Sequence, residues 1–279
     1  MGVRWLLAVL TAAVVVGSAA GATGPAAGSA AFLAGRQGPG GGFAEQGRAP
    51  DGTLTAWAAL GLVASGGFPA ERARAAEFLH AHPASAGTDA DVALQVVALS
   101  ALGETIDEAT LDRLRSHRPG TLVNETIWAV IALRAAGEQV PPALVQGLLA
   151  AQAKGGGFSW SRGGLPDSND TAAAIEALRA TGAAPPAVRR ALTALASFRN
   201  DDGGYALTKG RESDTQSTAW AIQALLSAGQ RPGKAPFRYL SRVRRADGSY
   251  RYSARYATTP VWVTAQVLPA LTGKPFPLR

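Results

Sequence analysis

Acidic residues recur at one place in this 279-residue sequence, directly before segments rich in Ala, Leu and Trp. Asp167 and Asp170 precede one such segment, and Asp214 precedes another. If the segments are parallel helices in a ring, these carboxylates crowd one rim, where a pair could act as acid and base on a glycan or an isoprenoid. The alternative is structural, because the amides and dipole of a helix N-terminus stabilise a carboxylate.

Tryptophans recur near the start of the same segments, at Trp57, Trp128, Trp220 and Trp262. Walls of aromatic rings bind flat apolar ligands and stabilise cations. We therefore expect these side chains to line the mouth of a cavity, with Asn169 and Glu125 as polar ligand contacts. Packing of the same rings between helices is the competing interpretation.

The sequence predicts neither a metal site nor a cofactor. It contains no Cys, which excludes thiolate zinc sites, iron–sulfur clusters, thiol nucleophiles and disulfides. His80, His82 and His117 lack the spacing of two His and a carboxylate that is typical of a metal site.

Positive charge is concentrated near the C-terminus. The chain has a net charge of +7, and residues 231–255 alone sum to +7, with eight Lys or Arg against Asp247. Arg238, Arg242 and Arg245 share one face if this segment is helical. They predict docking on an anionic surface such as the cell envelope, although a solvated outer helix explains the same charges. We expect no nucleic-acid partner.

A repeat must position these residues. Thr or Val, followed seven positions later by Leu and eleven later by Gly, occurs five times, beginning at Thr55, Val92, Thr126, Thr171 and Thr218. A sixth copy, from Trp262 to Gly273, is irregular. Four copies are preceded by Leu, then Gln or Arg four positions on, then after five residues an aromatic side chain, at Phe43, Phe158, Tyr205 and Tyr250.

Each repeat predicts an amphipathic outer helix, a Gly-rich turn and an inner helix that ends at a left-handed Gly. Thr at the start of the inner segment suits N-capping, helped by Asp170 or Ser217 just before it. The Phe and Tyr residues are predicted to wedge neighbouring repeats together. The inner helices are apolar nearly all round and must be buried on all sides. Six pairs therefore predict an all-α protein, an α6–α6 toroid with a central cavity at one end, in a single domain over residues 23–279.

These residues resemble the repeats of the terpenoid cyclase and protein prenyltransferase superfamily. The Leu-x3-Gln-x5-Phe element is similar to the Gln/Trp-type repeat of squalene–hopene cyclases, and the Thr-x-Trp-Ala helices resemble the inner barrel of that toroid. The resemblance covers residues 28–273. It implies the fold more than a function, since the same toroid hosts cyclases, prenyltransferases, cobalamin carriers and thioester domains.

One segment, Asp167-Ser168-Asn169-Asp170-Thr171-Ala172, resembles the Asp-x-Asp-Asp-Thr-Ala motif of hopene-type cyclases. The resemblance implies that the middle Asp of that motif protonates the substrate. Here Asn169 stands at its position, and an amide cannot protonate an alkene at a useful rate. The segment therefore keeps the residue pattern of the motif but lacks its proton-donating carboxyl group.

Residues 1–22 are typical of a secretory signal peptide, with Arg4, an apolar run from Trp5 to Val16 and then small residues. A permanent bilayer span takes about 20 apolar residues, so this run is short for an anchor, which is the alternative. We expect a secreted or envelope-located protein without a later membrane span.

Together these patterns predict an exported toroid that binds a hydrophobic or extended ligand, or a partner, in its central cleft without catalysis. Two alternatives stay open. One is an enzyme, either a degenerate terpenoid cyclase or prenyltransferase-like toroid or a glycan-active toroid that uses Asp167, Asp170 and Asp214. The other is a scaffold that docks on the envelope through its basic C-terminal repeat.

Overall fold

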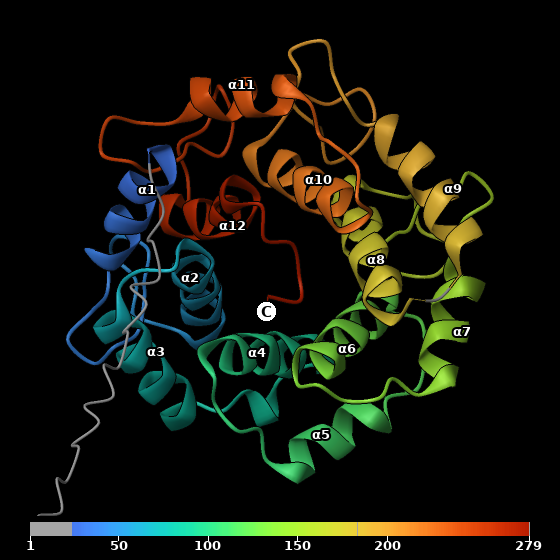
Figure 1. The fold of residues 1–279 in the computed structure, drawn as a ribbon, viewed down its shortest axis with the longest axis horizontal. Coiled ribbons are helices and arrows are strands. Elements are labelled where there is room, and N and C mark those ends of the chain that lie inside the picture. The colour runs from blue at the N-terminus through green and yellow to red at the C-terminus, as the bar shows by residue number, and fades with distance from the viewer. Residues whose placement is uncertain (1–23, 183, 279) are drawn as a thin grey trace, which may run out of the picture.

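Two concentric rings of helices make up the structure. The computed structural model describes residues 24–182 and 184–278, and this part of the chain contains twelve α-helices. Figure 1 shows them closing into a double ring. The inner ring consists of α2 (Gly52–Ser65), α4 (Asp89–Leu102), α6 (Val123–Ala135), α8 (Ser168–Thr181), α10 (Thr215–Ser227) and α12 (Pro260–Thr272). The outer ring consists of α1 (Pro25–Ala34), α3 (Pro69–Ala81), α5 (Glu108–Arg115), α7 (Pro142–Ala151), α9 (Pro185–Ala196) and α11 (Lys234–Val243). A short 3-10 helix, η1 (Ala84–Ala86), joins α3 to α4. The predicted α6–α6 toroid is confirmed.

The predicted signal peptide, residues 1–22, lies outside the residues that the structure describes. Within the described ranges, no helix has both the length and the apolar character that crossing a bilayer requires.

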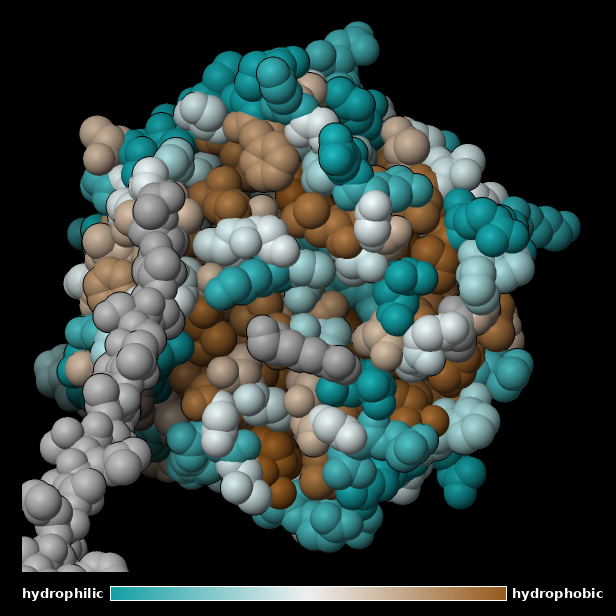
Figure 2. Space-filling model, in the orientation of Figure 1, coloured by the Kyte–Doolittle hydropathy of each residue, from teal (hydrophilic) through white to brown (hydrophobic). Residues whose placement is uncertain are grey.

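The inner helices are enclosed because they lack a polar face. Eleven of the fourteen residues of α2 are buried, and α6 and α8 bury ten each. A glycine with φ between 68° and 86° follows each inner helix, as the repeat predicts, at Gly66, Gly103, Gly137, Gly182, Gly229 and Gly273. Figure 2 shows hydrophobic side chains between the two rings and hydrophilic ones along the outer margin.

The Gly-rich loops approach the next outer helix closely. Gly41 has a φ of 84°, and a Cβ at this position would collide with the backbone of Arg74 in α3. Gln37 holds the contact, because its Nε2 donates to the loop carbonyl of Gly41 at 2.8 Å and to Glu71 O of α3 at 2.7 Å. Gln152 makes the equivalent pair of bonds to its own loop and to α9, both at 2.8 Å. The repeated Gln is thus a clamp between successive repeats.

The repeated Thr does not cap its helix, so that prediction is wrong. In the fifth repeat the N-cap is Asp214, whose carboxylate accepts from Ser217 N at 2.7 Å. Thr218 lies one turn into α10, and its hydroxyl accepts from the backbone N–H of Tyr205 at 2.9 Å. The same bond, 2.9–3.0 Å long, joins Phe43 to Thr55, Phe158 to Thr171 and Tyr250 to Thr264. The four aromatic side chains are buried, as predicted for wedges, and the Thr hydroxyls hold their backbone in place.

For three inner helices, the following repeat completes the N-terminus. Backbone amides at the start of three inner helices donate to a carbonyl in the loop of the following repeat. These bonds, 2.7–2.9 Å long, join Val123 to Trp160, Ser168 to Leu207 and Thr215 to Tyr252.

The first repeat closes the ring. The N-cap of α12, Thr259, makes no side-chain cap. Instead the carboxylate of Glu45, in the loop between α1 and α2, accepts from Trp262 N at 2.9 Å and from Val261 N at 3.3 Å. Because α12 also packs against α1 and α2, the two ends of the repeat array form one continuous interface.

We expect Glu45→Ala to lower the free energy of unfolding by about 1–2 kcal/mol, since two amides of α12 lose their acceptor. Glu45→Gln, which keeps one side-chain oxygen, should lose less. Urea unfolding followed by tryptophan fluorescence measures both. Glu77→Ala, at an exposed position of α3, is the matched control, and an equal loss in Glu45→Ala and Glu77→Ala would contradict the closing role.

Candidate functional site

A cleft of about 460 Å³ lies in the centre of the ring, where the inner helices begin. All six inner helices contribute to it. Its apolar lining consists of Trp57, Ala90, Leu94, Trp128, Trp160, Ala173, Leu207, Trp220 and Trp262. Its polar lining consists of Asp91, Asn124, Asp167, Asn169, Asp170, Gln216 and Gln266. The structure therefore brings the four predicted tryptophans together with three residues of the Asp-x-Asn-Asp motif.

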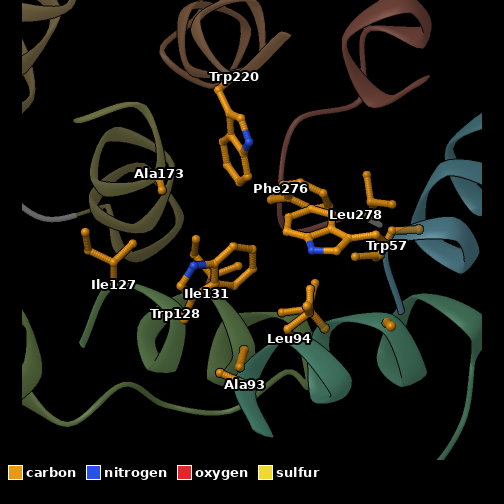
Figure 3. Close-up of a cluster of buried hydrophobic side chains, with 14 of the residues drawn as sticks. Trp57, Ala93, Leu94, Ile127, Trp128, Ile131, Ala173, Trp220, Phe276 and Leu278 are labelled. Carbon is orange, nitrogen blue, oxygen red and sulfur yellow. The ribbon is translucent and has the colours of Figure 1, made fainter. Parts of the chain in front are cut away.

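Three indoles, those of Trp57, Trp128 and Trp220, form a tryptophan cluster at the ring axis (Figure 3). Their ring centroids are 5.5–5.9 Å apart, and their planes meet at 82–90°. This edge-to-face geometry is the favoured one for aromatic pairs. All three are buried, so both interpretations of the tryptophans hold in part: the cluster packs the helices together and also forms the floor of the cleft.

Two further aromatic or apolar side chains stand at the mouth of the cleft. Trp160 is 56% exposed and lies in the loop before α8, while Leu207 is half-exposed in the loop before α10. Both loops are fixed by their backbone bonds to the preceding inner helix. The repeat pattern did not point to Trp160. This residue stands out only by the exposure of its side chain, which the structure shows and the sequence does not.

Asp167 and Asp170 lie side by side at the start of α8. Asp167 is the N-cap and accepts from Asp170 N at 2.8 Å. Burial, and next the neighbouring Asp170 carboxylate, raise the pKa of Asp167 from 3.8 to about 8. Asp170 is buried, and its Oδ1 accepts from Asn124 Nδ2 of α6 at 2.7 Å. The cleft therefore presents a carboxylic acid that keeps its proton at neutral pH, beside a second carboxyl held in a fixed position.

The other predicted polar residues are placed differently. Asn169 lines the cleft and is half-buried. Asp214 caps α10, and burial raises its pKa to about 6, but it is not part of the cleft lining. Glu125, half-buried in the first turn of α6, also lies outside that lining. Asp214 caps its helix outside the cleft lining, whereas Asp167 both caps its helix and faces the cleft.

Gln266 is another cleft residue that the sequence analysis missed. Its side chain is 1% exposed, and its Oε1 accepts from Trp220 Nε1 at 2.9 Å. An indole N–H is a donor only, so this bond fixes the orientation of the amide and leaves the NH2 group as the free end. That Nε2 has no hydrogen-bond partner among the described residues. The sequence does offer one signal for this residue, a Gln in the middle of a mostly apolar helix.

The predicted docking residues lie apart from the cleft. Arg238, Arg242 and Arg245 are exposed on or just after α11, in the outer ring. Arg242 Nη2 donates to Asp202 O at 2.6 Å, and its guanidinium lies over the ring of Tyr239, 5.7 Å from the centroid. Within the ranges that the structure describes, no group of three or more His, Asp or Glu side chains could hold a metal ion.

The fold of the chain is similar to that of several solved structures. No protein-family model and no curated protein matches the chain. A protein from Actinoplanes matches with a TM-score of 0.69 at 18% identity, over 89% of this chain and 98% of that one. The type II terpene cyclase MstE from Scytonema, as a variant with its substrate, matches with a TM-score of 0.64 at 17% identity over 89% and 95%. A wild-type glycosidase matches with a TM-score of 0.62 at 15% identity over 88% and 95%.

At these identities the likeness concerns the fold. The sequence repeats predict the same architecture, and the helix order is that of a closed double ring. The chain thus has an α–α toroid fold, which its structural neighbours show in both a type II terpene cyclase and a glycosidase.

Proposed function

We propose that the protein binds, without catalysis, a small molecule that has a large apolar body and a hydrogen-bond acceptor. The observation that carries this proposal is the unpartnered amide NH2 of Gln266, held beside Trp220 in an aromatic-lined cleft. A buried donor without a partner costs free energy, which a ligand acceptor would recover. The cleft volume of about 460 Å³ also falls in the range typical of small-molecule sites.

A prenyl chain with a polar head group fits this lining best. Ala90, Leu94 and Ala173 offer no hydrogen bonds to the hydroxyls of a sugar, and the tryptophan cluster forms an apolar floor. Among the structural neighbours, MstE was solved with geranylgeranyl dihydroxybenzoate and a glycosidase variant with glucose. The balance of apolar to polar groups favours the first kind of ligand.

We expect geranylgeraniol to change the tryptophan fluorescence and raise the melting temperature. Gln266→Met, which keeps the side-chain length and removes the donor, should weaken binding about 5–10-fold, as expected for one hydrogen bond. Gln230→Met, at an exposed position after α10, is the matched control. Cellohexaose tests the glycan alternative. The proposal would be contradicted if geranylgeraniol produced no response, or if Gln266→Met bound it as tightly as the natural protein does.

A second candidate function, acid catalysis on the same ligand, rests on Asp167. Its carboxyl faces the cleft and, with a pKa of about 8, carries at pH 7 the proton that a general acid needs. The indoles of the tryptophan cluster would stabilise positive charge that develops on the ligand. Product analysis after incubation with geranylgeraniol separates the two functions: a cyclised product that disappears in Asp167→Asn means catalysis, and unchanged geranylgeraniol means binding alone.

The protonation of Asp167 predicts that stability falls as the pH rises from 5 to 7. Between its ordinary pKa of 3.8 and its raised pKa of about 8, the folded protein holds a proton that the unfolded chain has lost. The free energy of unfolding should therefore decrease by up to about 1.4 kcal/mol per pH unit from this group. Asp167→Asn keeps an N-cap and removes the titration, so its slope should be shallower.

Urea unfolding at pH 5, 6 and 7 measures these slopes. Asp51→Asn, at the equivalent exposed N-cap of α2, is the matched control. Identical slopes for the natural protein and Asp167→Asn would mean that Asp167 is ionised in the folded state, and acid catalysis by this group would be ruled out.

A further inference from the structure

The last residues of the chain fill the far end of the ring. After α12, residues 274–278 turn back into the middle of the double ring (Figure 1). Phe276 and Leu278 are only 3% and 7% exposed, and Figure 3 shows both beside the tryptophan cluster. This C-terminal tail, residues 274–278, is thus packed as core although it belongs to no helix.

Phe276 meets the tryptophan cluster on the side away from the cleft. Its ring centroid lies 5.7 Å from that of Trp220, 6.0 Å from that of Trp57 and 6.4 Å from that of Trp128. The three indoles line the cleft, but Phe276 does not. One layer of aromatic rings therefore separates the cleft from the tail.

A buried carboxyl, that of Glu176, contacts the tail at this end of the ring. Glu176 follows Asp170 by six residues in α8, which places it about 9 Å further along the helix axis. It is fully buried, and its Oε2 accepts from Phe276 N at 3.0 Å. Its Oε1 has no partner among the described residues. Burial raises the pKa of Glu176 well above its ordinary value, which favours the neutral acid, and Oε1 leaves hydrogen-bonding capacity unused.

We propose that this end of the ring is a second binding site, for an aromatic group that carries one neutral hydrogen-bond donor, and that the protein's own tail fills it. The aromatic group would take the place of the Phe276 ring under the tryptophan cluster, and its donor would take the place of Phe276 N on Glu176. This site lies beyond the cleft proposed above and does not depend on the ligand of that cleft.

The tail makes few hydrogen bonds to the ring. Among the described residues, the bond from Phe276 N to Glu176 is the one hydrogen bond that joins residues 275–278 to the ring. The remaining contacts are apolar packing of Phe276 and Leu278. A ligand that replaces these contacts must therefore offer an aromatic ring and a comparable apolar surface.

A truncation tests the site directly. The chain ending at Lys274 should bind one more molecule of N-phenyl-1-naphthylamine, a neutral aromatic amine with one N–H, than the full chain binds. A peptide with the sequence of residues 275–279 should compete for this additional site only. In the truncated chain, Glu176→Leu should weaken the additional site at least fivefold, while Glu176→Gln, which keeps an acceptor, should weaken it less. A folded truncated chain with no additional site would overturn the proposal.

A second measurement leaves the tail in place. Because the chain has no Cys, Leu278→Cys introduces a single thiol whose modification reports exposure of the tail. N-phenyl-1-naphthylamine should raise the modification rate at least tenfold by displacing the tail. Ser197→Cys, in the outer ring after α9, is the exposed control and should not respond. An unchanged rate at Leu278→Cys under saturating amine would show that the tail is fixed core and would overturn the proposal as well.

Discussion

The whole structure depends on helices that have no polar face. Each inner helix is apolar nearly all round, so it gains stability only where it is covered on every side. A row of such helices would leave its two end helices half-covered. A closed ring covers all six, with the amphipathic helices outside and α12 packed against α2. The ring therefore closes because its inner helices are apolar nearly all round.

The same constraint places the polar chemistry at the helix ends. The first amides of each inner helix need acceptors, and the ring collects these ends at one rim. Asp214 and Asp51 serve this purpose outside the cleft lining, whereas Asp167 also faces the cleft and keeps its proton. Capping and site chemistry thus draw on the same kind of carboxylate, and Asp167 differs from Asp214 because it also lines the cleft. The amide of Asn124 assists by holding Asp170 across the gap between α6 and α8.

Features that repeat were predictable from the sequence, and features that occur once were not. The glycine stops and the ring itself follow from spacing that recurs in every unit, and the buried aromatic wedges follow from spacing that recurs in four. Gln266 and Glu176 each occur in one helix, and their roles depend on which side of that helix faces the axis. Phe276 lies beyond the last repeat, so no period includes it. The Thr was misassigned because a residue one turn inside a helix looks like a cap until the true N-cap is located.

The contacts between repeats also impose an order on synthesis. The first amides of α6, α8 and α10 find their acceptors in the repeat that follows, and those of α12 find theirs in Glu45, more than 200 positions earlier in the chain. A chain emerging from the ribosome therefore leaves α6, α8 and α10 each incomplete until the next repeat has been translated, and α12 is completed by the first repeat. Open repeat arrays need capping units at both ends and can unravel from them. A ring joined in this way has no such ends, so its repeats should unfold together rather than one by one.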